Sequence, residues 1–189
     1  MEPHVSWVHV DVSDGVFASI MIFNDPAALI GLESRANIEL HLMIDKPEEH
    51  LTDWLKTPAK RFLVHVESTK DFCAVWEKLT AAGVETGLAM KPETPLEEYD
   101  PHAEFVKYVL ILGVTPGPSG QHMQHDIINK VMHLRHKHPR CTIEIDGGVS
   151  LPLGTAKKAI EAGANVLVSG YDIFSSNDIA KTIERFRSL

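Results

Sequence analysis

The 189-residue sequence contains little cysteine, no long apolar run and few positive charges. Its two cysteines, Cys73 and Cys141, are too few for a disulfide framework and too far apart for a Cys-x-x-Cys motif, so we expect free thiols. No segment reaches the roughly 18 consecutive apolar residues that a membrane-spanning helix needs. Residues 1–8 also lack the basic and apolar regions of a secretory signal peptide, which predicts a cytoplasmic protein with no membrane partner.

Acidic residues outnumber basic ones by 26 to 18 and give a formal net charge of −8. A nucleic-acid partner requires lysines and arginines that neutralise phosphates, so this balance argues against nucleic-acid binding. The most basic stretch, residues 134–140, is typical of the solvated end of a helix. The chain has 44% hydrophobic residues and neither a linker nor a low-complexity tract, so we expect one globular domain over residues 1–189.

Short aliphatic and β-branched runs alternate with amphipathic stretches along the whole chain. The runs predict seven strands, at residues 6–12, 37–43, 61–66, 84–90, 106–113, 142–146 and 165–169. The amphipathic stretches predict helices at residues 47–57, 69–83, 125–138 and 153–164. Strands that alternate with helices in this way form a parallel sheet with helices packed outside it.

Two topologies fit such an alternation, an open doubly wound sheet and a closed barrel. A doubly wound nucleotide-binding domain usually carries Gly-x-Gly-x-x-Gly after its first strand, and this sequence has no such motif there. Polar residues at the ends of several strands favour the barrel, whose catalytic groups gather at the C-terminal rim. We therefore expect an α/β fold of the TIM-type (β/α) barrel class, truncated to about seven parallel strands with outer helices.

Several of the predicted strands carry histidine or a carboxylate on one face. Side chains two residues apart on a strand point the same way, so His9 and Asp11 share a face while the neighbouring valines point to the other side. The same spacing groups His41 with Glu39 and Met43, His65 with Leu63 and Glu67, and Glu144 with Asp146. A single inward histidine is more often a hydrogen-bonded core residue, but buried charges on four strands call for partners or a metal.

Imidazole and carboxylate together suit one divalent transition metal, namely Zn, Fe, Mn or Co. His9, Asp11, His41 and Asp146 would supply two nitrogens and two carboxylates to such an ion. His65 and Glu67 would lie either in a second layer around the metal or in the packing. Two carboxylates on opposite sides of a pocket also suit proton removal beside a carbonyl and proton return to the other face, through an enediolate.

Glycines mark the ends of the last two predicted strands, in residues 145–150 and 168–174. Loops at this place in a barrel often bind phosphate through backbone N–H groups, and a tight strand-to-helix turn explains either glycine pair equally well. Residues 113–121 are either a mobile lid or an ordinary long loop; they lack the Gly-Lys-Ser/Thr of a Walker A motif.

Taken in order, these segments resemble the ribulose-phosphate 3-epimerase family, metal-dependent (β/α) barrels that interconvert ribulose 5-phosphate and xylulose 5-phosphate in the pentose phosphate pathway of carbohydrate metabolism. The matching segments are HVDVSDG (9–15), ELHLMIDKPE (39–48), VHVE (64–67), PETPLE (92–97), VLILGVTPGPSGQ (109–121), IEIDGGV (143–149) and VLVSGYDIF (166–174). The resemblance implies catalytic acid/base roles for Asp11 and Asp146, metal binding by these two with His9 and His41, and phosphate or substrate binding by Gly120, Gly147, Gly148 and Gly170.

The sequence also departs from the family pattern. The matching segments begin at the family's second strand, so the resemblance implies a divergent member that is truncated at its N-terminus and lacks the first β/α unit. Ser13 replaces a pocket methionine, and we assign Ser13 and Met43 to the substrate pocket. Thr115, Pro118 and Ser119 differ in the loop after the fifth predicted strand, and Tyr171 stands where a small serine is usual.

Two functions follow from these observations. The first is an isomerase, a metal-dependent epimerase of a ketose phosphate that uses two aspartates and an enediolate intermediate. The alternative is a catalytically impaired barrel that binds metal or a phosphosugar, or serves as a scaffold. For either, the open edge of the first strand predicts a homodimer or higher oligomer that covers the gap left by the absent unit.

Overall fold

The computed structural model describes residues 2–189, which fall into two compact units. One unit comprises His4–Ala89 with Glu2, and the other comprises Met90–Leu189 with Pro3. We refer to them as the N-terminal and C-terminal units. The expectation of a single domain over residues 1–189 stays a prediction.

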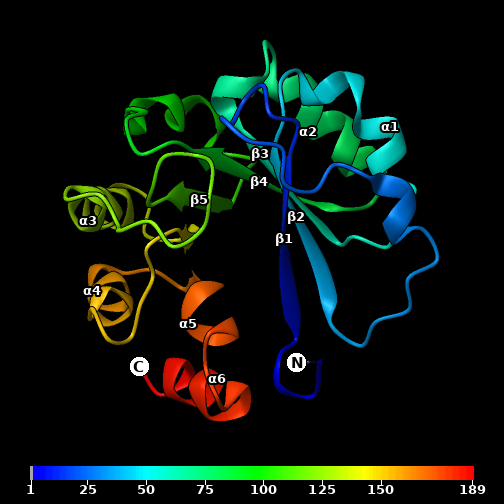
Figure 1. The fold of residues 1–189 in the computed structure, drawn as a ribbon. Helices are drawn as coiled ribbons and strands as arrows, with labels where there is room; N and C mark the ends of the chain where they lie inside the picture. The colour runs from blue at the N-terminus through cyan, green and yellow to red at the C-terminus, as the bar shows by residue number, and fades with distance from the viewer. Residues whose placement is uncertain (1) are drawn as a thin grey trace. The chain divides into compact units, whose positions relative to one another are not determined.

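The N-terminal unit is built on parallel strands that pair in chain order. They are β1 (Trp7–Ser13), β2 (Asn37–Met43), β3 (Arg61–His65) and β4 (Glu85–Met90, whose last residue is grouped with the other unit). Figure 1 shows β1 and β2 side by side in blue. The connections contain α1 (Leu51–Trp54), α2 (Phe72–Ala81) and the short 3-10 helices η1 (Glu2–His4), η2 (Pro26–Leu29), η3 (Pro47–Glu49) and η4 (Val66–Ser68).

Alternation along β2 separates the apolar core of this unit from its polar face. Leu40 and Leu42 are fully buried and point opposite to His41, as the two-residue period of a strand requires. Helix α2 starts where the Asp71 carboxylate accepts the Ala74 N–H, and it ends before Gly83, which has a φ of +76°. Local capping signals therefore determine where the helix begins and ends, and burial determines which face of each strand points into the core.

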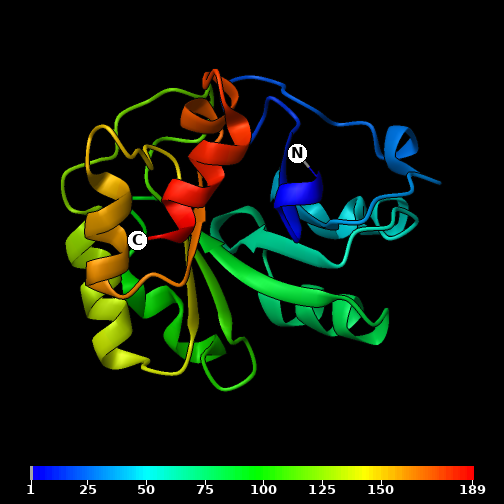
Figure 2. The same ribbon diagram turned by 90° about the horizontal axis from the view of Figure 1, so that it is seen from below.

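The C-terminal unit repeats the pattern with β5 (Tyr108–Leu112), β6 (Thr142–Asp146) and β7 (Val166–Val168), again parallel and in chain order. Its helices are α3 (Ile127–Lys137), α4 (Thr155–Ala162), α5 (Tyr171–Phe174) and α6 (Ile179–Arg187), with η5 (Leu96–Glu98) and η6 (Asp100–His102) before β5. Helices α3 and α4 lie side by side in both views (Figures 1 and 2).

Arg135 on α3 secures the end of α4. Its guanidinium donates to the carbonyl oxygens of Gly163 and Cys141 and to the side-chain oxygen of Asn165. Gly163 has a φ of +109°, and a Cβ there would lie 2.7 Å from Cγ of Arg135. Glycine is therefore required on both backbone and steric grounds.

Within residues 2–189 the seven predicted strands are confirmed, with ends that shift by at most two residues. The helix predicted at residues 47–57 is wrong as a single element, because the chain forms η3 and then the short α1 there. Lys46 adopts a left-handed φ of +46° just before Pro47, which starts a tight 3-10 turn in place of a continuous helix. Helices α5 and α6 were not predicted. Among the described residues, no helix combines the length and the apolar character needed to cross a bilayer.

Candidate functional site

The polar side chains of the N-terminal unit lie in rows that cross its strands. In the strand register, His9 is paired with Glu39, Glu39 with Arg61, and Arg61 with Glu85. Two residues further along each strand, Asp11 is paired with His41 and His41 with Leu63. Paired residues of parallel strands face the same side of the sheet, so both rows lie on one face. The predicted sharing of that face by His9, Asp11 and His41 is confirmed.

His9, Asp11 and His41 converge on one point, and we call them the His–Asp–His cluster. Oδ1 of Asp11 lies 2.9 Å from Nδ1 of His41 and 3.4 Å from Nε2 of His9. One ligand atom from each residue lies within 4.8 Å of those from the other two. Two ligands that each lie about 2.1 Å from a tetrahedral zinc ion are separated by about 3.4 Å. The cluster therefore has the donor types and the spacing that a divalent cation requires.

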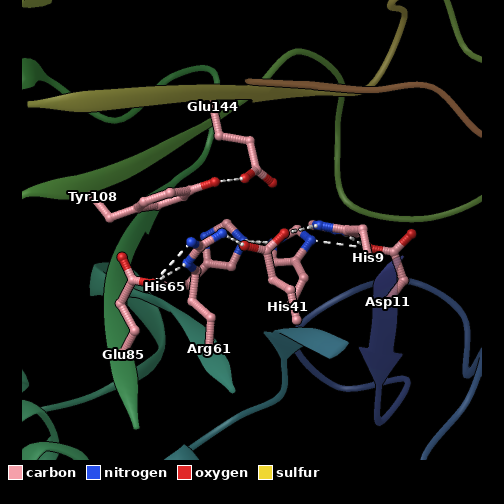
Figure 3. A network of polar contacts seen from close by, with 9 residues as sticks. His9, Asp11, His41, Arg61, His65, Glu85, Tyr108 and Glu144 are labelled. Atoms are coloured by element: carbon pink, nitrogen blue, oxygen red, sulfur yellow. Dashed lines mark hydrogen bonds and ion pairs between the residues drawn. The ribbon is translucent and has the colours of Figure 1, made fainter. Parts of the chain in front are cut away.

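A chain of charged side chains contacts Nδ1 of His9, the ring nitrogen that is not the one near Asp11 (Figure 3). Its Nδ1 lies 2.8 Å from Oε1 of Glu39, and Oε2 of Glu39 accepts a 2.7 Å hydrogen bond from Nη1 of Arg61. Arg61 also donates from Nε and Nη2 to Oε2 of Glu85, at 2.9 and 2.8 Å, and its guanidinium lies 4.0 Å over the Trp7 ring. The side chains of His9, Glu39 and Arg61 are 9%, 4% and 11% exposed, so the chain of contacts is shielded from water.

His41 has a similar support. Its Nε2 lies 2.9 Å from Nε2 of His65, whose Nδ1 lies 2.9 Å from Oε2 of Glu67. When His41 donates from Nε2, His65 accepts there and donates from Nδ1 to Glu67. With a cation bound, two neutral imidazoles would satisfy both contacts and leave the lone pair on Nδ1 of His41 for the cation, whereas without a cation Nδ1–H of His41 donates the 2.9 Å hydrogen bond to Asp11. A cation between Nδ1 of His41 and Oδ1 of Asp11 fits this proton arrangement.

The two acidic residues beside His9, Asp11 and Glu39, both have a lowered pKa. Burial by itself would raise the pKa of Asp11, but hydrogen bonds and charges from His41 and His9 outweigh it and hold the pKa well below its usual range. For Glu39, burial again opposes ionisation, and His9 together with Arg61 lowers the pKa. The lowered pKa of Asp11 favours the anionic carboxylate, which is the form that binds a metal.

The two residues predicted to line the substrate pocket, Ser13 and Met43, lie two positions after Asp11 and His41 on β1 and β2. Ser13 is paired with Met43 in the strand register, and both are buried. The Ser13 hydroxyl donates a 2.6 Å hydrogen bond to the Ile20 carbonyl and so closes the loop after β1. The pocket role of Ser13 and Met43 stays a prediction.

Asp146 is the last residue of β6 and belongs to the C-terminal unit. Glu144 lies two residues earlier on the same face, is fully buried and accepts a hydrogen bond from the Tyr108 hydroxyl (Figure 3). The roles of Asp146 as fourth metal ligand and acid/base residue stay predictions.

The loops after β5, β6 and β7 meet within the C-terminal unit. Gly148 has a φ of +69°, and a Cβ there would lie 2.2 Å from the backbone nitrogen of Met123. A Cβ at Gly120 would lie 3.7 Å from the Tyr171 ring. The predicted phosphate-binding glycines Gly120, Gly147, Gly148 and Gly170 all lie on these loops, and among the four only Gly147 and Gly148 have neighbouring atoms within 3 Å of an added Cβ. Their phosphate-binding role stays a prediction.

Sequence reasoning missed Arg61 and gave Glu39 no role. Glu39 was recognisable as the residue that shares the inward face of His41, two positions away. Arg61 was recognisable as a charge at the start of an apolar run. Their pairing with each other depends on strand register, which a single strand's sequence does not contain.

Comparison with known proteins places these features in a family. The model of the ribulose-phosphate 3-epimerase family matches residues 1–174. The cytoplasmic isoform of ribulose-phosphate 3-epimerase from Oryza sativa subsp. japonica is 32% identical over 186 residues, which cover 96% of this chain and 81% of the relative. The ribulose-phosphate 3-epimerase of Schizosaccharomyces pombe is 32% identical over 187 residues, with the same coverage of 96% and 81%.

Solved structures support the fold class. Thiamine phosphate pyrophosphorylase from Pyrococcus furiosus matches with a TM-score of 0.65 at 11% identity, covering 97% of this chain and 81% of that one. A 3-hexulose-6-phosphate synthase matches with a TM-score of 0.60 at 19% identity, covering 82% and 73% of the two chains. At such identities the likeness concerns the fold alone, and the predicted TIM-type (β/α) class is confirmed.

Proposed function

Because the chain belongs to the ribulose-phosphate 3-epimerase family, we propose that it interconverts ribulose 5-phosphate and xylulose 5-phosphate by moving a proton at C3. The observation that carries this proposal is the His–Asp–His cluster, in which an ionised aspartate lies between two histidine nitrogens. Such a carboxylate would be able to take a proton from carbon next to a carbonyl when a bound cation polarises that carbonyl and so acidifies the carbon.

We assign the binding of one divalent cation, Zn, Fe, Mn or Co, to His9, Asp11, His41 and Asp146. The donor set of two imidazoles and carboxylate oxygens suits these metals better than Mg or Ca. When bound, the cation supplies Lewis acidity toward the substrate oxygens. Asp11 and Asp146 act as the acid/base pair: one carboxylate removes the C3 proton, and the other delivers a proton to the opposite face of the enediolate.

The phosphate of the substrate binds, in this proposal, to backbone N–H groups of the loops after β5, β6 and β7. Because they have no side chain, Gly120, Gly147, Gly148 and Gly170 would let a ligand approach their backbone N–H groups closely. Backbone donors need no lysine, which agrees with the formal net charge of −8. We assign the reaction to the cytoplasm by analogy with the relative from Oryza sativa, which is a cytoplasmic isoform.

The test is exchange of the C3 hydrogen of ribulose 5-phosphate in deuterated water, followed by NMR after loading the protein with each of the four metals. Asp11→Asn and Asp146→Asn are expected to abolish exchange while the melting temperature stays close to that of the wild type. Asp126→Asn is the matched control, since that side chain is 88% exposed. Metal binding without exchange under any loading would contradict the epimerase proposal and favour the binding module.

A further inference from the structure

Glu39 divides its two carboxylate oxygens between two donors. Oε1 faces Nδ1 of His9 at 2.8 Å, and Oε2 accepts from Arg61 at 2.7 Å. A carboxylate has no proton to give, so the hydrogen of this contact lies on Nδ1 of the imidazole. Nε2 lies 3.4 Å from Oδ1 of Asp11, and it carries a lone pair whenever His9 is neutral, as a metal ligand must be.

Arg61 keeps Glu39 in this orientation. It is the next residue in the same row of the sheet, one strand beyond Glu39. Its guanidinium is fixed on two further sides, by the Trp7 ring at 4.0 Å and by Glu85 at 2.8 and 2.9 Å. A planar group held at three places presents Nη1 to Glu39 in one direction, which leaves Oε1 for His9.

We propose that Glu39 and Arg61 are positioning residues that fix the tautomer and ring orientation of His9, so that its Nε2 is ready to bind the cation. This inference rests on the proposed function, which assigns His9 as a ligand. It adds that the metal site reaches back across β1, β2 and β3 to a buried arginine. Histidine ligands commonly donate their second N–H to such a partner, and loss of the partner typically costs 10- to 100-fold in metal affinity.

Glu39→Gln separates this role from simple packing, because glutamine keeps the shape and loses one acceptor. Arg61 only donates, so the single amide oxygen turns to Arg61 and the NH2 group meets Nδ1 of His9. The proton of His9 then moves to Nε2 and blocks that nitrogen. We expect cobalt and zinc affinity, measured by competition with a chromophoric chelator, to fall about 10- to 100-fold. In 15N-labelled protein without metal, at a pH where His9 is neutral, the His9 tautomer is expected to change from Nδ1–H to Nε2–H.

Two variants serve as controls. Glu39→Asp retains both acceptor oxygens and is expected to keep the Nδ1–H tautomer. Glu161→Gln changes a carboxylate on α4 that is 64% exposed and lies outside this chain of contacts, and is expected to change metal affinity by less than about twofold. Wild-type affinity in Glu39→Gln, or an Nε2–H tautomer of His9 in the metal-free wild type, would overturn the inference. If Glu39→Gln does not fold, the wild-type tautomer alone decides between the two outcomes.

The proposed function is tested separately by the same measurements. His9→Ala is expected to weaken cation binding more than Glu39→Gln does. Unchanged affinity in His9→Ala would remove His9 from the metal site and overturn both statements. A wild type that binds the cation through His9 but does not exchange the C3 hydrogen would contradict the epimerase proposal and leave the positioning role intact.

Discussion

Replacement of Asp14 is expected to loosen the loop that follows β1. Its Oδ1 accepts hydrogen bonds from the N–H groups of Val16 at 2.7 Å and Phe17 at 3.0 Å, and its Oδ2 accepts one from Asp45 at 2.7 Å. One carboxylate thus shapes the turn after β1 and ties it to the turn after β2. Asp14→Ala removes all three bonds.

The magnitude follows from the exposure of these bonds. A hydrogen bond to a charged group contributes about 1.5 to 3 kcal/mol when it is buried, and less where water replaces the lost acceptor. The bond from Val16 is exposed and the other two are partly buried, so we expect Asp14→Ala to lower the free energy of unfolding by about 2 to 3 kcal/mol. Asp14→Asn keeps one oxygen for Val16 and Phe17 and is expected to cost about 1 kcal/mol.

The pH dependence has a definite sign. Burial alone would raise the pKa of Asp14, but the three backbone N–H groups outweigh it and lower the pKa. The folded-state pKa therefore lies below that of the unfolded chain, so this stabilisation is complete above the ordinary aspartate range, near pH 4, and is lost as the pH falls through the lowered pKa. The difference between wild type and Asp14→Asn should thus be largest near neutral pH and shrink in acid.

Urea unfolding followed by circular dichroism at pH 7, 5 and 3 measures these differences. Asp126→Asn is the control and is expected to change stability by less than about 0.5 kcal/mol. A cost below about 0.5 kcal/mol for Asp14→Ala, or equal costs for the alanine and asparagine variants, would refute the reasoning.

Three further predictions follow from other parts of the molecule. The urea midpoint of Gly148→Ala is expected to be lower than that of Gly154→Ala, because both positions have positive φ but only Gly148 has backbone within 4 Å of the added Cβ. Equal midpoints would contradict the close approach at Gly148. Glu67→Gln is expected to weaken cobalt binding several-fold in a competition titration, because Glu67 contacts His65 and His65 contacts His41. Unchanged affinity would show that Glu67 does not act on the metal site through these contacts. Sedimentation at micromolar concentration is expected to give a dimer or higher oligomer, with more than about 1,000 Å² buried at the β1 edge, whereas a monomer would contradict this prediction.

The strands and the polar face of β1 were predictable from the sequence because their signals are local. Runs of five to eight largely apolar residues gave the strands, and the two-residue period alone placed His9 and Asp11 on one face. Gly83 and Gly163 marked the ends of α2 and α4 for an equally local reason, since a left-handed residue ends a helix wherever it occurs.

The environment of the cluster was decided by tertiary structure. Glu39 lies beside His9 and Arg61 because β2 pairs with β1 and β3 in one register, and a shift of one residue would turn Glu39 to the other face of the sheet. The contact between His41 and His65 likewise joins residues 24 positions apart. Strand pairing is non-local and depends on packing over the whole unit, so a strand's own sequence reveals which side chains face inward, while only the folded sheet determines which partners they meet.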